Sequence, residues 1–464
     1  IIKSYKILFW FSIFLKMSSK RFNISLNNKI SAFRKTIKVD SDKSISIRSF
    51  IIGSICQNVS IVKNVLESMD VKSAIESCRK LGVRIQRIKP KSYKIYGKGL
   101  GSLSVNKNVE LNFGNSGTLA RLLIGVLSST PNINIRLKGD YSLNKRSMKK
   151  LIILMSEFGA TFLPKNKFNF PLKMISSNFP VGIKYIAGVS AQLKSAVILA
   201  GLNSHGNTVV VEQKKSRDHT ENMLLINSGA LNIKNNKKKI IIIKGKKNLK
   251  PLNIKVPGDP SSAAFFTALT LLRKGSSLKI KNIGLNPTRI GFYKLLKKHN
   301  AQVKFLNQKK INNELHGDVL ITSCKLKPLS ASKSYYVNST DEYPILFIVA
   351  ALTKGVSIFK GIEDLANKES NRIKEMQKIL KQIGIKTIYS RNELKIFGEG
   401  MIDASKKKIS VPNLGDHRIC MATFILAVLT GAKTKIKNFE TVFTSSPSFL
   451  NIMKTLGAKF EIHK

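Results

Sequence analysis

Six short polar motifs recur along this chain, and each runs directly into an apolar stretch of about ten residues. The motifs begin roughly 70 to 80 residues apart, at Lys43, Asn115, Ser190, Asp259, Asp341 and Asp416. Regular recurrence of this kind is the signature of a fold built from repeated units. Because the spacing is longer than that of the common solenoids, each unit must be a larger supersecondary element.

The segments between the motifs also follow one pattern. After each apolar helix, alternating residues predict a strand, at residues 59–65, 133–137, 208–211, 278–283, 356–362 and 434–439. An amphipathic helix follows and ends at KLGV, EFGA, NSGA, KHNA, QIGI or TLGA. Glycine, the usual residue just past a helix end, is present in every copy but the fourth. Each unit is therefore predicted to contain helix, strand, helix and strand, in places with an extra strand.

Six such units fill almost all of the 464 residues, which is more than one hydrophobic core usually serves. We therefore predict an α/β protein of two domains, with three units each and a cleft between them. The first domain is expected at residues 42–257 and the second at residues 28–41 plus 258–464. The chain then crosses between domains near Ser41 and Gly258, and the N-terminal strand joins the C-terminal half. Residues 1–27 are expected to be an N-terminal extension.

The N-terminus contains an apolar run, ILFWFSIFL, at residues 7–15. This run is too short to span a bilayer, and no small-residue cleavage site of a secretory signal follows it. Because Met17 begins a polar stretch, we expect translation to start there and residues 1–16 to be untranslated. A targeting or tethering segment is the alternative.

The composition is strongly basic. Lysine and arginine number 80 against 26 acidic residues, which gives a formal net charge of +54. Such a charge favours an anionic partner: nucleic acid, anionic lipid or phosphorylated metabolites. Lysine, isoleucine and asparagine are also abundant together, as in residues 232–250, which is typical of codon bias in an AT-rich genome. Lysine excess alone is therefore no sign of RNA binding.

Cysteine usage indicates a reducing compartment. Cys56, Cys78, Cys324 and Cys420 are widely spaced and form no CxxC pair, and the six histidines are scattered. We therefore expect a cytoplasmic protein without a structural metal.

The motifs lie where helices are predicted to begin, and free backbone N–H groups favour anions there. In KSISIR, Ser44 and Arg48 are four residues apart on one helical face, and Lys43 lies at the helix start. Three donors can therefore converge on one phosphate. In NKESNR, Glu369 is three residues before Arg372, so both can face one cleft.

Ten motifs occur in order between residues 42 and 421: DKSISIRSF, GNSGTLAR, GDYSLNKRSM, SAQLKSAVILAGL, SRDHTENML, VPGDPSSAAF, NPTRIG, DEYPI, NKESNRI and GDHRICM. In order and spacing they resemble the 5-enolpyruvylshikimate-3-phosphate synthase family, over about residues 28–464. The resemblance implies a two-domain inverted α/β barrel, in which three βαβαββ units give each domain threefold pseudo-symmetry.

The activity that the resemblance implies is transfer of the enolpyruvyl group of phosphoenolpyruvate to the 5-hydroxyl of shikimate 3-phosphate, with release of phosphate. This reaction belongs to the shikimate pathway of chorismate and aromatic amino-acid biosynthesis, and it needs no redox cofactor or metal. The expected partners are the two small anionic substrates, with no nucleic acid and no membrane. We expect a cytoplasmic monomer that is a target of glyphosate.

Two alternatives remain. UDP-N-acetylglucosamine 1-carboxyvinyltransferase has a related fold and uses the same donor. The resemblance to it is poorer, and its reactive loop cysteine has no counterpart between Gly139 and Lys150. A basic RNA-binding protein would explain the charge, but the aromatic platforms and glycine-basic motifs typical of such proteins do not occur.

The resemblance also implies a set of site residues. Those implied to bind shikimate 3-phosphate are Lys43, Ser44, Arg48, Ser190, Ala191, Gln192, Arg217, Asp341 and Lys368. Those implied to bind phosphoenolpyruvate are Lys43, Gly117, Arg146, Gln192, Arg372 and Arg418. Catalysis is assigned to Asp341 as proton acceptor, to Glu369 for the methylene proton, and to Lys43.

Several positions depart from the family pattern. The family's Pro-Gly before DKSISIR is Asp-Ser at residues 40–41, and its usual His or Asn before the arginine is Ile47. Its LRVKESDR segment is LANKESNR here, with Ala366 and Asn371 as departures. The lysine that many members carry shortly before a C-terminal proline has no counterpart in residues 443–447. That cation must be absent or supplied elsewhere.

Overall fold

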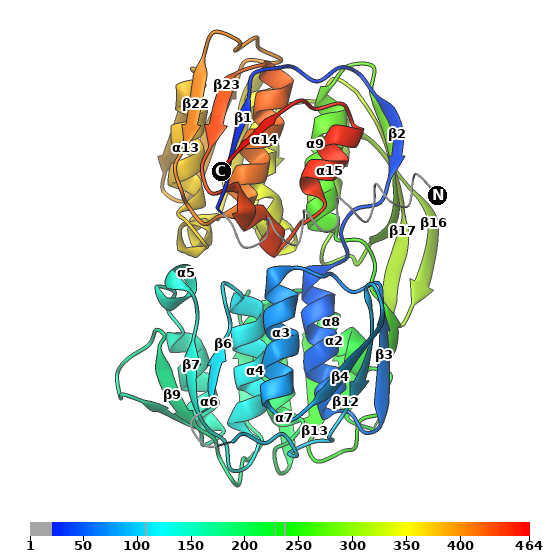
Figure 1. Cartoon of the computed structure of the whole chain (residues 1–464), viewed down its shortest axis with the longest axis vertical. Helices are drawn as coiled ribbons and strands as arrows, with labels where there is room; N and C mark the ends of the chain where they lie inside the picture. The colour runs from blue at the N-terminus through cyan, green and yellow to red at the C-terminus, as the bar shows by residue number, and fades with distance from the viewer. Residues whose placement is uncertain (1–20, 107–108, 228, 236–237) are drawn as a thin grey trace.

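The computed structural model describes residues 21–106, 109–227, 229–235 and 238–464. The apolar run near the N-terminus and the expected start at Met17 lie outside these residues. Two lobes are stacked along the long axis of the molecule (Figure 1).

Each lobe has its own hydrophobic core. Buried apolar side chains of the described residues form two clusters. One cluster lies within residues 45–256, and the other combines residues 22–37 with residues 263–458. The lower lobe in Figure 1 therefore comes from the first half of the chain, and the upper lobe from the second half together with the N-terminal strands.

The repeat is visible in the strand order. Within the described residues, the strands form six four-stranded sheets, and all six have the same topology. In a unit written β-α-β-α-β-β, the first strand pairs in parallel with the second, the second pairs antiparallel with the fourth, and the third lies at the edge. The predicted two-lobed inverted α/β barrel of six units is confirmed.

The lower lobe contains units one to three. Unit one consists of β14 (Asn253–Lys255), α2 (Lys43–Ile55), β3 (Val59–Lys63), α3 (Met69–Lys80), β4 (Arg84–Lys89) and β5 (Ser92–Tyr96). Unit two consists of β6 (Glu110–Asn112), α4 (Gly117–Ser128), β7 (Asn134–Lys138), α5 (Tyr141–Asn144), α6 (Lys149–Glu157), β8 (Thr161–Leu163) and β9 (Leu172–Ile175). Unit three consists of β10 (Lys184–Ala187), α7 (Ala191–Gly201), β11 (Asn207–Glu212), α8 (His219–Leu224), β12 (Leu231–Asn235) and β13 (Lys239–Lys244).

The upper lobe contains units four to six. Unit four consists of β2 (Arg34–Ile37), α9 (Pro260–Leu272), β15 (Ser277–Gly284), α10 (Gly291–Lys298), β16 (Gln302–Ile311) and β17 (Glu314–Thr322). Unit five consists of β18 (Ser330–Ala331), α11 (Lys333–Ser339), the 3-10 helix η1 (Thr340–Glu342), α12 (Tyr343–Ala351), β19 (Gly355–Lys360), η2 (Glu363–Asn367), α13 (Arg372–Gln382), β20 (Thr387–Ser390) and β21 (Glu393–Gly398). Unit six consists of β22 (Lys408–Val411), α14 (His417–Thr430), β23 (Lys433–Ile436), η3 (Phe439–Thr444), α15 (Phe449–Thr455), β24 (Glu461–His463) and β1 (Asn23–Leu26).

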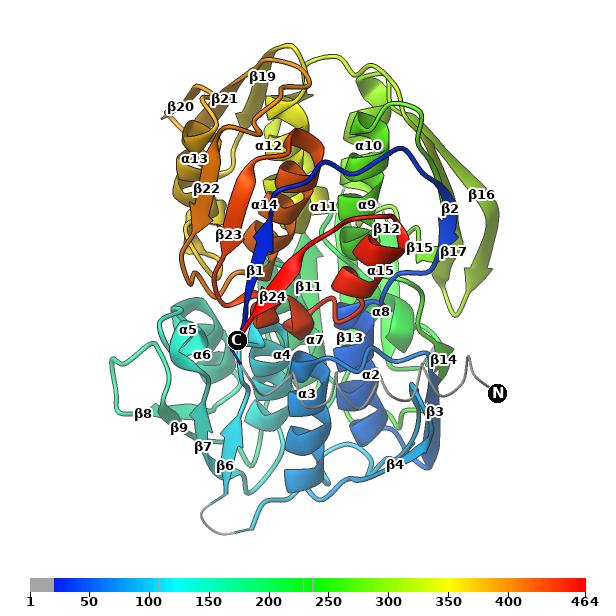
Figure 2. The same ribbon diagram turned by 45° about the horizontal axis from the view of Figure 1, so that its top comes forward.

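Strand β1 corrects the expected N-terminal boundary. The sequence pattern placed residues 1–27 in an extension, but β1 lies between β23 and β24 in the sheet of unit six (Figure 2). Ile24 and Leu26 alternate along β1 and are buried in the upper core. Four residues with two apolar side chains are too short a pattern to identify a strand before its partners are known.

The first helix of each unit is buried on nearly all sides, which explains the uninterrupted apolar runs after the motifs. Every residue of α14 is buried, as is every residue of α9 except the last. In five of the six units the second helix is followed by a residue in the left-handed region, such as Gly82 at φ 81°. Unit three differs from the prediction, because α8 ends at Leu224, before Gly229, and Gly229 does not have a positive φ. In unit four, Asn300 adopts φ 73° in place of glycine, which asparagine tolerates better than most residues.

The two chain crossings between the lobes lie side by side. Ser41 and Gly258 form an antiparallel bridge, and Asp259 N donates to the carbonyl of Asp40 at 2.8 Å. We propose residues 42–257 as one domain and residues 23–41 plus 258–464 as the other. The crossings then form the hinge between the two domains.

Candidate active site

Ion pairs join the two lobes at their boundary. In each pair the arginine and the carboxylate come from different lobes: Arg217–Asp341 at 2.7 Å, Arg289–Asp42 at 2.8 Å and Arg146–Glu369 at 3.7 Å. The structure therefore brings motifs from five of the six units together at one place. The predicted catalytic carboxylates are among them.

Helix α2 begins at this boundary and carries the KSISIR motif. Its N-cap, Asp42, accepts a hydrogen bond from Ile45 N at 2.8 Å. Lys43 is the first helical residue, and its Nζ lies 3.0 Å from Asp70 Oδ2. Lys43 and Ser44 are both partly exposed, so both remain accessible at the helix start.

Arg48 lies one turn further along α2 and is buried. Its Nε donates to Thr220 Oγ1 at 2.8 Å, and its Nη2 donates to Ser195 Oγ at 3.2 Å. Its Nη1 donates to the carbonyl of Ser44 at 3.1 Å, as their four-residue spacing allows. Burial lowers the pKa of Arg48 to about 10. The side chain is thus held in place by hydroxyl groups of unit three.

Gln192 joins α7 to α4. Ser190 is the N-cap of α7 and Ala191 is its first residue. Gln192 Nε2 donates to Thr118 Oγ1 at 3.0 Å, and its Oε1 accepts from Arg121 Nη1 at 2.9 Å. The side chain of Gln192 therefore connects the starts of two helices that carry predicted site motifs.

Two guanidinium groups cover the start of α4. A Cβ added at Gly117 would lie 2.6 Å from Arg121 Nη1 and 3.3 Å from Arg146 Nη1. Burial, followed by the charge of Arg146, lowers the pKa of Arg121 to about 10. Sequence reasoning missed Arg121. The signal was present, because Arg121 follows Gly117 by four residues, as Arg48 follows Ser44.

Asp341 lies in η1 at the start of the DEYPI segment. Burial alone would raise its pKa, but the charges of Arg217 and Arg418 hold the pKa of Asp341 well below its usual range. The carboxylate is therefore ionised at neutral pH. Such a group can accept a hydrogen bond, and then a proton, from a hydroxyl.

Arg372 connects three carboxylates, although only 1% of its side chain is exposed. Its Nε donates to Asp416 Oδ2 at 2.9 Å and its Nη2 donates to Glu369 Oε2 at 2.6 Å. Its Nη1 lies 3.9 Å from Asp341 Oδ1. Burial alone would raise the pKa of Glu369, but the charges of Arg372 and Arg146 hold it well below its usual range.

Arg418 has unused hydrogen-bonding capacity. Its Nε and Nη1 are buried and have no hydrogen-bond partner among the described residues. The guanidinium group lies 5.9 Å from the centre of the Phe265 ring. Burial, followed by the charges of Arg418 and Lys43, holds the pKa of His417 well below its usual range, so this imidazole is neutral. A buried cation with unpaired donors is suited to bind an anion.

Lys368 has a carboxylate partner of its own. Its Nζ lies 2.5 Å from Asp364 Oδ2, which also accepts from the Tyr336 hydroxyl at 2.8 Å. Although Lys368 precedes Glu369 in the chain, the two side chains thus belong to different ion pairs.

Two departures from the family pattern contact each other. Residues 443–448 contain no basic side chain. Instead, Ser446 Oγ and Ser448 Oγ donate to Asp40 Oδ2 at 3.2 and 2.7 Å, and Ser448 N donates to the same oxygen at 2.9 Å. The carboxylate of Asp40 therefore connects the first chain crossing to the segment where the family lysine is missing.

In the part of the chain that the structure describes, no cluster of three histidine, cysteine or carboxylate side chains is placed to hold a metal ion. The same part holds no helix whose length and apolar character would let it cross a membrane. The four cysteines lie within the described residues as free thiols, three of them buried.

The two-lobed fold of six units also occurs in an enolpyruvyl transferase of known structure. The enolpyruvyl transferase NikO from Streptomyces tendae matches with a TM-score of 0.71 over 95% of this chain and 98% of that one. The sequences are 14% identical, so this likeness concerns the fold alone.

The chain belongs to the EPSP synthase (3-phosphoshikimate 1-carboxyvinyltransferase) family, whose sequence model matches residues 27–453. The 3-phosphoshikimate 1-carboxyvinyltransferase of Zymomonas mobilis is 38% identical over 431 residues, which cover 92% of this chain and 94% of that protein. The one from Sulfurihydrogenibium is 36% identical, with 92% and 98% covered. The structure of EPSP synthase from Acinetobacter baumannii matches with a TM-score of 0.82 at 32% identity, over 96% of this chain and all of that one.

Proposed function

We propose that this chain transfers the enolpyruvyl group of phosphoenolpyruvate to the 5-hydroxyl of shikimate 3-phosphate and releases phosphate. One observation carries the proposal: two ionised carboxylates, Asp341 and Glu369, meet arginines from separate units at one lobe boundary. Both substrates carry a phosphate and a carboxylate, so a cleft with this charge pattern suits them.

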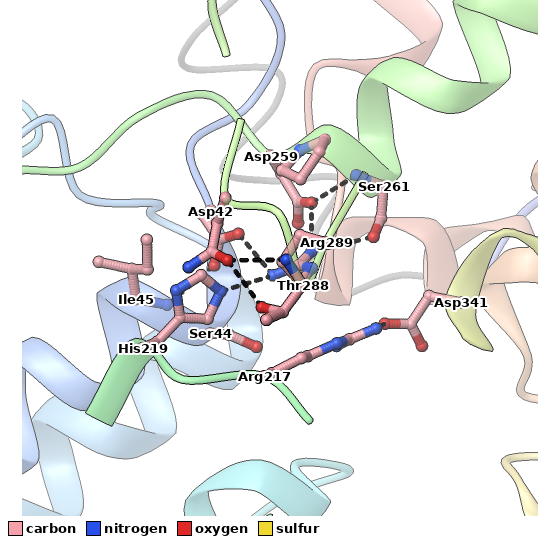
Figure 3. Close-up of polar contacts among 12 residues, drawn as sticks. Asp42, Ser44, Ile45, Arg217, His219, Asp259, Ser261, Thr288, Arg289 and Asp341 are labelled. Atoms are coloured by element: carbon pink, nitrogen blue, oxygen red, sulfur yellow. Dashed lines mark hydrogen bonds and ion pairs between the residues drawn. The ribbon is translucent and has the colours of Figure 1, made fainter. Parts of the chain in front are cut away.

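Shikimate 3-phosphate is proposed to bind where α2, α7 and the SRDHT segment meet. The start of α7, at Ser190 and Ala191, offers backbone N–H groups to a phosphate. Ser44 and Arg217 add a hydroxyl and a guanidinium group (Figure 3). Asp341 then faces the substrate hydroxyls. Arg48, Gln192 and Lys368 complete the proposed set.

Phosphoenolpyruvate is proposed to bind between Arg146, Arg372 and Arg418. Arg146 Nη1 and Arg372 Nη2 both approach Glu369, and the free donors of Arg418 are available for phosphate or carboxylate oxygens. Arg121 also belongs to this group, because it contacts Gln192 and covers Gly117. Lys43 lies between the two substrates in this arrangement.

The reaction requires two proton transfers. The 5-hydroxyl oxygen bonds to C2 of phosphoenolpyruvate and loses its proton, while the methylene carbon gains a proton and becomes a methyl group. Phosphate then leaves C2, and the methyl group loses a proton to restore the double bond. Asp341 is proposed to take the hydroxyl proton. Glu369 is proposed to deliver and remove the proton at the methylene carbon.

The anionic substrate itself would prepare Glu369 for this role. Arg372 and Arg146 lower the pKa of Glu369, and a bound phosphate would neutralise part of their charge. The pKa of Glu369 would then rise, which makes it a better proton donor while the substrate is present.

We further propose that the enzyme works as a cytoplasmic monomer that binds neither nucleic acid nor membrane. Free thiols are typical of reducing compartments. A single chain also contributes every residue proposed to bind the two substrates.

A phosphate-release assay tests the proposal. Release should require both substrates, and omission of either one should abolish it. Replacing shikimate 3-phosphate by UDP-N-acetylglucosamine tests the related transferase reaction, for which we expect no release. Phosphate release from phosphoenolpyruvate in the presence of UDP-N-acetylglucosamine, but not in the presence of shikimate 3-phosphate, would reject the proposed acceptor.

A further inference from the structure

Arg289 of the NPTRIG motif contacts groups in both lobes and is not among the residues proposed to bind the substrates (Figure 3). Only 3% of its side chain is exposed. Its two terminal nitrogens reach four acceptors: Asp42 Oδ2 at 2.8 Å, His219 Nε2 at 3.1 Å, Asp259 Oδ1 at 3.1 Å and Ser261 Oγ at 3.0 Å. The motif that contains it has no role in the proposed chemistry.

The Nη1 nitrogen connects Arg289 to the lower lobe. Asp42 is the N-cap of α2, directly before Lys43 and Ser44 of the proposed acceptor site. His219 is the first residue of α8. Because a guanidinium group only donates, His219 Nε2 must accept, and the ring proton on Nδ1 faces Glu314 Oε1 at 2.7 Å.

The Nη2 nitrogen connects Arg289 to the upper lobe. Asp259 is the N-cap of α9, at the second crossing of the chain. Ser261 Oγ also donates to Glu342, the residue that follows the proposed proton acceptor Asp341. One side chain therefore links the start of the acceptor-binding helix with the segment that carries the catalytic carboxylate.

We propose that Arg289 is a positioning residue that sets the start of α2 relative to Asp341. The proposal rests on the proposed function, because it assigns these two segments to one active site. A planar guanidinium group can hold two carboxylates and two further acceptors in fixed directions. The ammonium group of a lysine is a single point of charge, so a lysine at this position could not make all four of these hydrogen bonds.

The two nitrogens should have separable effects. Asp42→Asn keeps a residue that can cap α2 but removes the charge that Nη1 contacts. It should mainly weaken binding of shikimate 3-phosphate. Ser261→Ala removes the link from Nη2 to Glu342 and should mainly lower kcat. Arg289→Lys should do both.

Calorimetric titration with shikimate 3-phosphate, together with steady-state kinetics, tests this division. For Arg289→Lys we expect the Kd to rise and kcat to fall, each by about tenfold or more, because small misplacements of reacting groups are costly. For Asp42→Asn the rise in Kd should exceed the fall in kcat, and for Ser261→Ala the order should be reversed. Arg87→Lys, at a surface pair with Glu67, is the matched control and should change neither. Kd and kcat within about twofold of wild type for Arg289→Lys would overturn the proposal.

Amide hydrogen exchange provides a readout that needs no substrate. Exchange should become faster at residues 43–48 and at residues 341–346 in Arg289→Lys, but not in Arg87→Lys. Unchanged exchange at both segments would reject the positioning role, even in an enzyme of different activity. If the wild type is inactive with both substrates but the exchange pattern is as expected, the proposed function is rejected. The positioning role of Arg289 between the lobes would still be supported.

Discussion

Arg217 Nη2 lies 2.7 Å from Asp341 Oδ2 and joins unit three of the lower lobe to unit five of the upper lobe. Burial alone would raise the pKa of Asp341, and Arg217 is foremost among the charges that outweigh burial. The same pair therefore contributes both to contact between the lobes and to ionisation of the proposed proton acceptor.

The proposed proton transfers can be tested by removing each carboxylate. Asp341→Ala and Glu369→Gln should each lower turnover by about 100-fold or more, because each variant lacks a proton-transfer partner. Binding of shikimate 3-phosphate should remain measurable by calorimetry in both. Turnover near that of the wild type in either variant would remove that residue from its assigned role.

The pH dependence of activity should respond to Arg217. The lowered pKa keeps Asp341 ionised in the wild type as the pH falls through the ordinary aspartate range, near about 4. In Arg217→Gln the pKa of Asp341 should rise, so the acidic limb of the kcat/KM profile should move to higher pH. Arg217→Lys keeps the charge and should move the limb less. Identical acidic limbs in all three enzymes would show that Arg217 does not control the ionisation of Asp341.

Asp40 should reduce stability at neutral pH. Burial raises the pKa of Asp40, against the hydrogen bonds from Ser448. A carboxyl group whose pKa is higher in the folded than in the unfolded state contributes stability below its unfolded pKa. That contribution is lost as the pH rises through its folded pKa. Asp40→Asn should therefore raise the Tm by about 1–3 °C near pH 7, with the gain fading toward about pH 4.

Asp403→Asn is the matched control for this measurement. A hydrogen bond from Ser405 N lowers the pKa of Asp403 to about 2, so the linkage has the opposite sign and no gain is expected at neutral pH. Calorimetric unfolding at both pH values distinguishes the two carboxylates. A lower Tm for Asp40→Asn at neutral pH would contradict the expected cost of the buried charge.

Inhibition by glyphosate should depend on Gly117. A methyl group there would displace Arg121 and crowd Arg146, and overpacking of this kind costs about 1–3 kcal/mol. Because glyphosate is slightly longer than phosphoenolpyruvate, Gly117→Ala should weaken binding of glyphosate by about tenfold or more. Binding of phosphoenolpyruvate should weaken less.

Gly188→Ala is the control for Gly117, because an added Cβ at Gly188 meets nothing within 4 Å. Its response to both ligands should match that of the wild type. Equal loss of glyphosate and phosphoenolpyruvate in Gly117→Ala, measured in competitive inhibition assays, would show that Gly117 does not form the wall of the donor pocket.

The repeated part of the fold could be predicted from the sequence because the pattern of each unit depends on residues that are close together in the chain. A buried apolar helix, an alternating strand and a second helix recur in register, and all six predicted strands following the first helices are present. The predicted site motifs converge for a similar reason, since they lie at corresponding helix starts in units of one topology.

What could not be predicted depends on contacts between distant segments. β1 becomes a strand only through β23 and β24, which lie about 400 residues further along the chain. The role of Arg289 could not be predicted either, because its four hydrogen-bond partners lie in segments that are distant in the sequence. Asp40 and the stretch that contains Ser446 are each visible as departures from a family pattern, but only the structure shows that Ser446 contacts Asp40.

Analysis of the product by mass spectrometry and ³¹P nuclear magnetic resonance is the most direct test of the proposed reaction. With shikimate 3-phosphate and phosphoenolpyruvate, we predict that one inorganic phosphate appears for each shikimate 3-phosphate that gains an enolpyruvyl group. In D₂O the vinyl methylene of the product should carry deuterium, because its carbon is protonated and then deprotonated. Phosphate release without modification of shikimate 3-phosphate, or no release with both substrates present, would contradict the proposed function.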